Sequence, residues 1–175
     1  MKKYILLAAL FCGLFAVSCK KESKPALNGE VTLSSQILGS SVYYTYGFSF
    51  VAAKLQKYPG EQVDLILAVV QPQDSITASF FTSTDYDGTF NNSYFNANLD
   101  SATAWYNSYT EATASSFNAI TDTIKPGQVI TYKSAAGKYA KFLVESYILV
   151  KPQSGNQYAT AKIKWAYQPD GTNKF

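Results

Sequence analysis

Residues 139–171 read YAKFLVESYILVKPQSGNQYATAKIKWAYQPDG, and their pattern sets the architecture that we expect for the chain. The second half alternates apolar side chains with polar or lysine side chains, a period of two that is typical of a half-buried strand. Its apolar positions are Ala159, Ala161, Ile163, Trp165 and Tyr167. A slip of one residue would bury two lysines, so the register of this strand is firmly determined.

The first half, residues 139–150, predicts the partner strand, and the Pro- and Gly-containing turn 151–156 joins the two. We expect one face of the partner strand to carry Ala140, Phe142, Val144, Ile148 and Val150, opposite Lys141, Glu145 and Tyr147. Another strand is expected over 129–133, followed by a tight connection at 135–137. Together these segments predict a three-stranded antiparallel meander at the C-terminus.

Further strands are predicted upstream of the meander. Alternation over residues 42–50 places one set of side chains on a common, core-facing side: Val42, Tyr44, Tyr46, Phe48 and Phe50. The apolar run 63–70, interrupted only by Asp64, suits a strand buried on both faces, with 76–81 as its hairpin partner. Residues 82–99 are rich in Ser, Thr, Asn and Asp, and predict a long loop held down by its aromatic side chains.

A short helix is expected after this loop. Asp100 or Ser101 could cap its N-terminus, and a stripe of Ala102, Trp105 and Tyr109 would then face the core. The predicted fold class is therefore mainly β, with antiparallel sheets, the C-terminal meander and one short helix near 100–110. Residues 31–175 have a length that suits a single domain.

The N-terminus carries the pattern of a secretory signal. Two lysines follow the initiating methionine, an apolar run continues to Val17, and Ser18 and Cys19 come next. This resembles the lipobox of bacterial lipoproteins, so we expect cleavage between Ser18 and Cys19 and acylation of the Cys19 sulfur, for example with palmitate. Residues 1–18 would be the signal peptide and residues 19–30 a flexible tether. The expected location is the bacterial cell envelope, at the outer membrane, with the membrane bound through the lipid anchor.

Missing residue types exclude several classes of function. The chain has no His and no Arg, its one Met is Met1, and its two Cys are Cys12, within the signal, and Cys19. No Ser-His-Asp or Cys-His arrangement can form, and zinc and copper lose their usual ligands. We therefore expect no enzyme, no catalytic residue and no metal site. A formal net charge of +3 without a clustered basic face gives no reason to expect nucleic-acid binding.

Carboxylates are the remaining candidate catalytic groups. Asp85 and Asp87 lie two residues apart in the sequence TDYDG, and paired acids can hydrolyse glycosides. Asp and Gly also favour tight turns, and a polar turn is the interpretation that we prefer here.

The last third of the chain carries motifs of a known family. These are AGKYAKF at 136–142, VESY at 144–147 and WAYQPDG at 165–171. They resemble the closing region of HmuY-like lipoproteins, and residues 63–65 are similar to that family's Trp-Asp-hydrophobic strand, with Val63 replacing the tryptophan. The resemblance implies a mostly β, surface or secreted haem binder, in which His or Met pairs can hold the iron. This chain offers neither pair, which leaves a tyrosinate among its 14 Tyr as the iron ligand.

Two functions follow as expectations. The first is a lipid-anchored, non-enzymatic binding module of the cell envelope, with haem as the ligand that the resemblance implies. The many aromatic side chains of the chain could stack on a porphyrin or a sugar ring, or they could fill the core. The alternative is a structural or adhesive surface lipoprotein without a small ligand, whose partner would be a glycan or an envelope protein.

Three tripeptides resemble the Asp-Ser/Thr-hydrophobic acceptor of bacterial O-glycosylation. They are DSI at 74–76, DSA at 100–102 and DTI at 122–124. The resemblance implies glycans on Ser75, Ser101 and Thr123. The alternative interpretation is that Asp-Ser and Asp-Thr start turns and cap helices.

Overall fold

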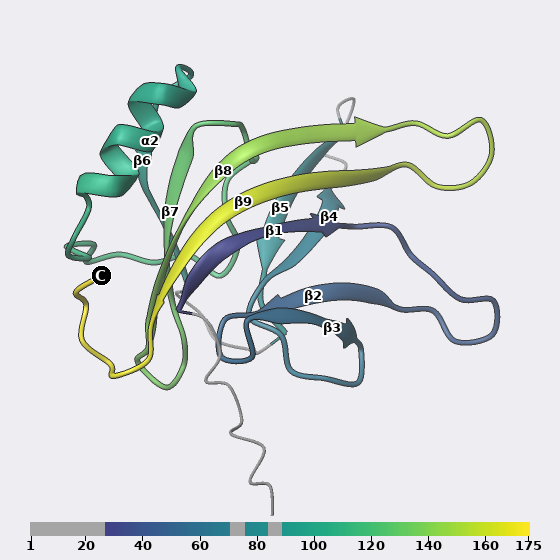
Figure 1. The fold of residues 1–175 in the computed structure, drawn as a ribbon. Helices are drawn as coiled ribbons and strands as arrows, with labels where there is room; N and C mark the ends of the chain where they lie inside the picture. The colour runs from purple at the N-terminus through teal and green to yellow at the C-terminus, as the bar shows by residue number, and fades with distance from the viewer. Residues whose placement is uncertain (1–26, 71–75, 84–88) are drawn as a thin grey trace, which may run out of the picture.

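A computed structural model of the chain describes residues 27–70, 76–83 and 89–175. A five-stranded antiparallel sheet forms its centre, with the order β1-β9-β8-β7-β6 (Figure 1). Its strands are β1 (Asn28–Ser34), β6 (Phe90–Phe95), β7 (Gln128–Lys133), β8 (Tyr139–Val150) and β9 (Tyr158–Gln168). Strands β7, β8 and β9 form the expected meander, so the predicted fold class is confirmed.

Two hairpins and one helix complete the described structure. Strands β2 (Thr45–Ser49) and β3 (Lys54–Tyr58) form one hairpin, and β4 (Ile66–Val70) and β5 (Thr77–Phe81) form the other. Side chains of both hairpins pack with the core-facing side chains of the central sheet in one hydrophobic cluster. The helix α2 (Leu99–Ser108) belongs to a second, smaller cluster with β7 and β8. It packs at the β6–β8 end of the sheet, away from the hairpins (Figure 1).

Aromatic rings make up much of the main core. The ring of Phe50, just after β2, is fully buried and stacks on Tyr167, with 5.9 Å between centroids. Trp165 packs against both Phe48 and Phe50, at 5.1 and 5.9 Å. All five apolar positions expected along β9 are buried, which confirms the register predicted for that strand.

Strand β8 has the predicted bounds but not the predicted face along its whole length. Its pairing with β9 shifts by one residue between Val144 and Ser146, which marks a β-bulge at Glu145. Ala140, Phe142 and Val144 are buried as expected. Beyond the bulge the alternation reverses: Tyr147 and Leu149 pack against the core, and Ile148 is 60% exposed. The assignment of Ile148 and Val150 to the core face is therefore wrong.

The helix begins earlier than expected. Its N-cap is Asn98, whose Oδ1 accepts a hydrogen bond from the backbone N–H of Ser101 at 2.9 Å, so the predicted caps at Asp100 and Ser101 are wrong. The amide oxygen of Asn98 satisfies a donor that the first turn would otherwise leave unpaired. Ala102 is buried as expected, whereas the second buried helix residue is Tyr106 rather than Trp105 or Tyr109.

Two strands occupy segments predicted as loop or tether. Residues 90–95 form β6, which pairs with β7, although their Asn and Ser content argues for a loop. Strand β1 begins at Asn28, three residues before the expected start of the domain, and pairs along its full length with β9. The expected hairpin of 63–70 with 76–81 is confirmed as β4 and β5.

Strand β2 is shorter than the predicted strand 42–50. Phe48 and Phe50 are buried, but Val42 and Tyr46 are 68% and 41% exposed, so their expected place in the core is wrong. Gly47 explains how β2 approaches its neighbour closely. A Cβ at this position would lie 2.6 Å from Cγ2 of Val63 and 2.8 Å from the carbonyl oxygen of Leu65, so only glycine fits without a shift.

Candidate functional site

A cleft lies between two long loops at one end of the molecule. The first loop, residues 35–44, follows β1, and the second, residues 151–157, joins β8 to β9. Both project in the same direction because Ser34, the last residue of β1, pairs with Thr160 near the start of β9 (Figure 1). Residues 66–69 of β4 form another wall of the cleft, which has a volume of about 580 Å³. We call it the loop cleft.

Aromatic and aliphatic side chains line much of the loop cleft. The aromatic ones are Tyr43, Tyr58 and Tyr158. Each comes from a different part of the chain: Tyr43 precedes β2, Tyr58 ends β3 opposite Thr45, and Tyr158 starts β9 opposite Val150. The aliphatic side is made by Ile37, Ile66, Leu67, Ala68, Val69 and Pro152. This composition is typical of a site for a small organic ligand.

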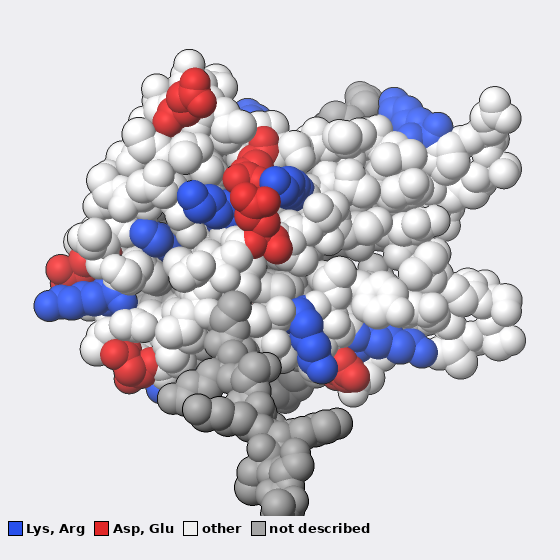
Figure 2. Space-filling view, in the orientation of Figure 1, with Lys and Arg blue, Asp and Glu red and all other residues white. Residues whose placement is uncertain are grey.

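Polar side chains without formal charge complete the lining. They are Ser35, Gln36, Thr45, Ser154, Asn156 and Gln157. Ser35 and Thr45 hold the framework: the backbone N–H of Ala159 donates to Oγ of Ser35 at 2.7 Å, and Oγ1 of Thr45 donates to the carbonyl of Ser34 at 3.1 Å. No Lys, Asp or Glu is among the described residues that line the cleft. The tips of both loops are also uncharged on the face shown in Figure 2.

A buried lysine at the other end of the sheet is the second candidate for a functional side chain. Lys141 on β8 is 6% exposed, and its Nζ donates hydrogen bonds to the carbonyls of Tyr106, at 2.9 Å, and Tyr109. The ammonium also lies 4.6 Å from the ring centroid of Tyr106 and 5.2 Å from that of Phe175. Desolvation and, to a lesser degree, the charge of Lys164 lower the pKa of Lys141.

These contacts give Lys141 a structural task. The C-terminal carbonyls of a helix lack partners within the helix, and a cation near them interacts favourably with the helix dipole. The last turn of α2 contains no basic residue, and Lys141 supplies that charge from β8. The chain end is fixed beside it, because the backbone N–H of Phe175 donates to the carbonyl of Thr110 at 2.8 Å. We therefore interpret Lys141 as the C-terminal cap of α2 rather than as a reactive amine.

Replacing Lys141 with Met should lower the free energy of unfolding by about 2 kcal/mol, because two carbonyls lose their donor and the helix loses its cation. Denaturant unfolding measures this loss, and hydrogen exchange should show it first in α2. Lys164→Met is the matched control: its Nζ donates no hydrogen bond to a helix carbonyl among the described contacts, and instead donates to the exposed side chain of Asn107 at 3.3 Å and lies 5.3 Å from the ring centroid of Tyr106. The control should change stability by less than about 0.5 kcal/mol. Equal effects of the two substitutions would contradict the capping role.

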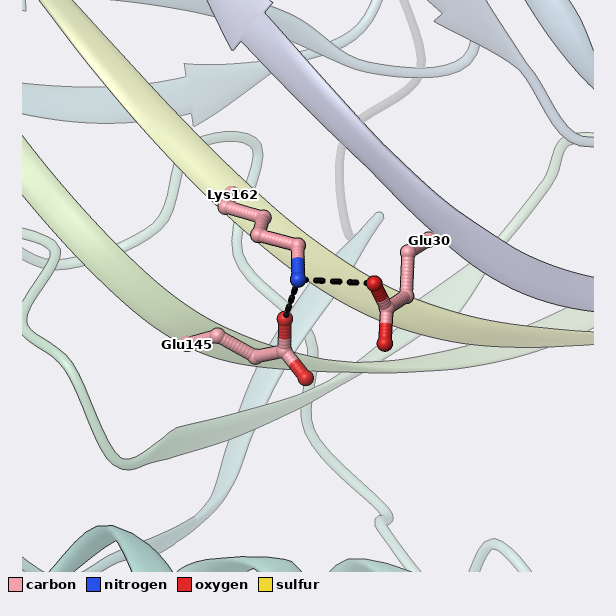
Figure 3. Close-up of polar contacts among 3 residues, drawn as sticks. All are labelled: Glu30, Glu145 and Lys162. Carbon is pink, nitrogen blue, oxygen red and sulfur yellow. Dashed lines mark ion pairs between the residues drawn. The ribbon is translucent and has the colours of Figure 1, made fainter.

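Opposite charges gather on the outer face of the sheet (Figure 2). Lys162 on β9 lies between two carboxylates, at 2.7 Å from Glu30 and 2.9 Å from Glu145 (Figure 3). The hydrogen bond and the charge of Lys162 lower the pKa of Glu30. A glycosidase needs one acid whose pKa is raised so that it can protonate the leaving group. The arrangement of Glu30 and Glu145 is that of an ion-pair cluster, and it lies outside the loop cleft.

Most of the site residues predicted from sequence lie outside the described residues. These are Ser18, Cys19 and Ser75, together with Asp85 and Asp87. Ser101 and Thr123 are both described and exposed. Ser101 lies in the first turn of α2, whereas Thr123 lies in the segment between α2 and β7, next to the buried Ile124. The sequence did not indicate the loop cleft, whose lining comes from five separate segments.

No family model, curated protein or solved structure matches this chain. Among the described residues, no helix is long and apolar enough to cross a membrane, and no group of three or more acidic, Cys or His side chains could hold a metal ion.

Proposed function

We propose that this chain is a lipid-anchored protein of the bacterial cell envelope that binds a small, flat ligand in the loop cleft. One observation supports ligand binding above all: Tyr43, Tyr58 and Tyr158 line the same cleft of 580 Å³ as a set of aliphatic side chains. Aromatic side chains offer a large stacking area together with a polar hydroxyl. The anchor rests on the sequence, through the lipobox-like residues that end at Cys19.

The direction of β1 supports this proposal. Asn28 begins β1 opposite Ala166, and Ser34 ends it opposite Thr160, beside the loops that form the cleft. The chain therefore enters the domain at the end remote from the cleft (Figure 1). The nine residues 19–27 can reach at most about 30 Å when fully extended. An anchor at Cys19 would keep the domain close to the bilayer, with the loop cleft on the far side.

Haem is the ligand that the resemblance to HmuY-like lipoproteins implies. The chain has no His and no Met besides Met1, so a haem iron would need a tyrosinate ligand. Three tyrosines line the loop cleft and are the candidates for this role. Haem and sugar rings are the two flat ligands that the lining can stack on.

Binding measurements on the full-length processed lipoprotein, purified in detergent, test the proposal. The titrants are haemin, followed by its Soret band, and a panel of neutral oligosaccharides, followed by calorimetry. We expect saturable binding of one of these classes, weakened about fivefold by Tyr43→Ala because a stacking ring is lost. Tyr46→Ala is the control, since Tyr46 is 41% exposed and does not line the cleft. No binding by either class, or equal affinities of the two variants, would refute the proposal.

A structural or adhesive role is the second candidate, and exposed apolar side chains on one loop favour it. Ile37, Val42 and Tyr43 are 61%, 68% and 66% exposed. Clustered apolar surface of this kind marks many protein contacts. If it serves adhesion, an envelope partner should be retained by the protein in the absence of any small ligand, and Val42→Lys should abolish the retention.

A further inference from the structure

We infer that the ligand of the loop cleft is an uncharged carbohydrate, an inference that rests on the proposed function and specifies its ligand. The lining combines three tyrosine rings with amide and hydroxyl side chains and, among the described residues, has no charged group. Each of these features selects for a different property of the ligand. Only their combination points to a sugar.

The absence of charge in the described lining selects for a neutral ligand. A carboxylate or phosphate that leaves water needs a cation or several hydrogen-bond donors in return. Haem carries two carboxylates, and no described Lys lines the cleft to pair with them. Among the described lysines, Lys141 and Lys162 lie on the outer side of the sheet. Lys57 and Lys151 precede two lining residues in the chain but are not part of the lining themselves. A neutral sugar needs no such partner.

The amides select for a ligand that both donates and accepts hydrogen bonds. The side chains of Gln36, Asn156 and Gln157 are exposed at the cleft. Each side-chain amide presents two donor hydrogens and one acceptor oxygen. A sugar hydroxyl also donates and accepts, so a pair of neighbouring hydroxyls can be met by one amide. Tyr43 and Tyr158 line the same cleft, and their rings could stack on the apolar C–H face of a sugar ring.

The amide side chains that line the cleft come from both of the loops that border it. Gln36 lies on the loop after β1, and Asn156 and Gln157 lie on the loop between β8 and β9. The two loops therefore present amides from different parts of the chain, with Tyr43 and Tyr158 beside them. A ligand held between the loops can be contacted from both sides.

An array of neutral oligosaccharides, their sialylated or sulfated counterparts, and haemin, all presented to the full-length processed lipoprotein, tests this inference. We expect binding to neutral oligosaccharides only. Gln157→Ala should weaken it about fivefold through the loss of hydrogen bonds. Gln153→Ala is the matched control, because Gln153 lies in the same loop but does not line the cleft, and it should bind as the wild type does.

The outcomes separate the two proposals. Neutral-glycan binding that Gln157→Ala weakens and Gln153→Ala does not supports both. Haemin binding that Tyr43→Ala weakens, without glycan binding, overturns the carbohydrate inference and leaves the proposed function standing. Preference for the charged oligosaccharides, or equal glycan affinity of the Gln157 and Gln153 variants, also overturns the inference. Failure of every probe to bind overturns both.

Discussion

Phe50→Ala should lower the free energy of unfolding by about 4 kcal/mol. This value lies within the range of about 3–5 kcal/mol that is typical when a buried Phe is truncated and leaves a cavity. Phe50 is fully buried, and its ring contacts five other aromatic rings of the core: those of Phe48, Tyr132, Phe142, Trp165 and Tyr167. These rings come from the central sheet and from the segment around β2, so one substitution loosens the contact between the two layers. Because whole domains are stable by about 5–15 kcal/mol, the variant should be close to unfolding.

Urea unfolding followed by tryptophan fluorescence measures this effect, because Trp165 lies beside Phe50. Val51→Ala is the control at the adjacent position, where the side chain is 61% exposed. It should shift the stability by less than about 0.5 kcal/mol. Similar unfolding midpoints for the two variants would show that the core is not organised around Phe50.

Cys19→Ala should abolish membrane attachment or leave the protein with its signal uncleaved, since the sulfur that we propose as the site of acylation would be lost. Each buried methylene of an acyl chain stabilises attachment by about 0.8 kcal/mol, so two or more chains hold a protein almost permanently. Fractionation of cells into membrane and soluble material, with intact-mass measurement of the protein, gives the result. The wild type should show the mass of the acylated chain that starts at Cys19.

Cys12→Ala is the control for this substitution. Cys12 is the other cysteine of the chain and lies within the apolar run of the proposed signal. Its replacement should leave processing and membrane attachment unchanged. Wild-type membrane attachment of the Cys19→Ala protein would show that lipid on this residue does not hold the protein in the envelope.

The meander could be predicted because local pattern and tertiary environment agree there. Every second residue of β9 from Ala159 to Tyr167 is buried, and lysines occupy positions between them. The bulge at Glu145 could not be predicted, because the apolar residues 147–150 contain no polar position that fixes one face. Strand β6 was missed for the opposite reason: its Asn and Ser residues carry little strand signal, and its pairing with β7 is a tertiary effect.

The loop cleft depends on tertiary structure even more strongly. Tyr43 and Tyr158 are more than 100 positions apart in the chain, and they line one cleft only because β1 pairs with β9. Alternation assigned the tyrosines around 43–46 to a strand, and Tyr44 and Tyr46 to its core face, although Tyr46 is exposed. The polar, Pro- and Gly-containing turn 151–156 could be predicted as a turn, but nothing in the sequence indicates that it lies beside residues 35–44.

Backbone amide NMR of the isotope-labelled, processed protein with and without its bound ligand tests the central claim most directly. We expect chemical-shift changes to concentrate in residues 35–45, at Tyr58, in residues 66–69 and in residues 152–158. The amides around Lys141 and the C-terminal Phe175 should stay unchanged. Changes that centre on Lys141, or that spread over the outer face of the sheet around Lys162, would contradict the assignment of the ligand site to the loop cleft.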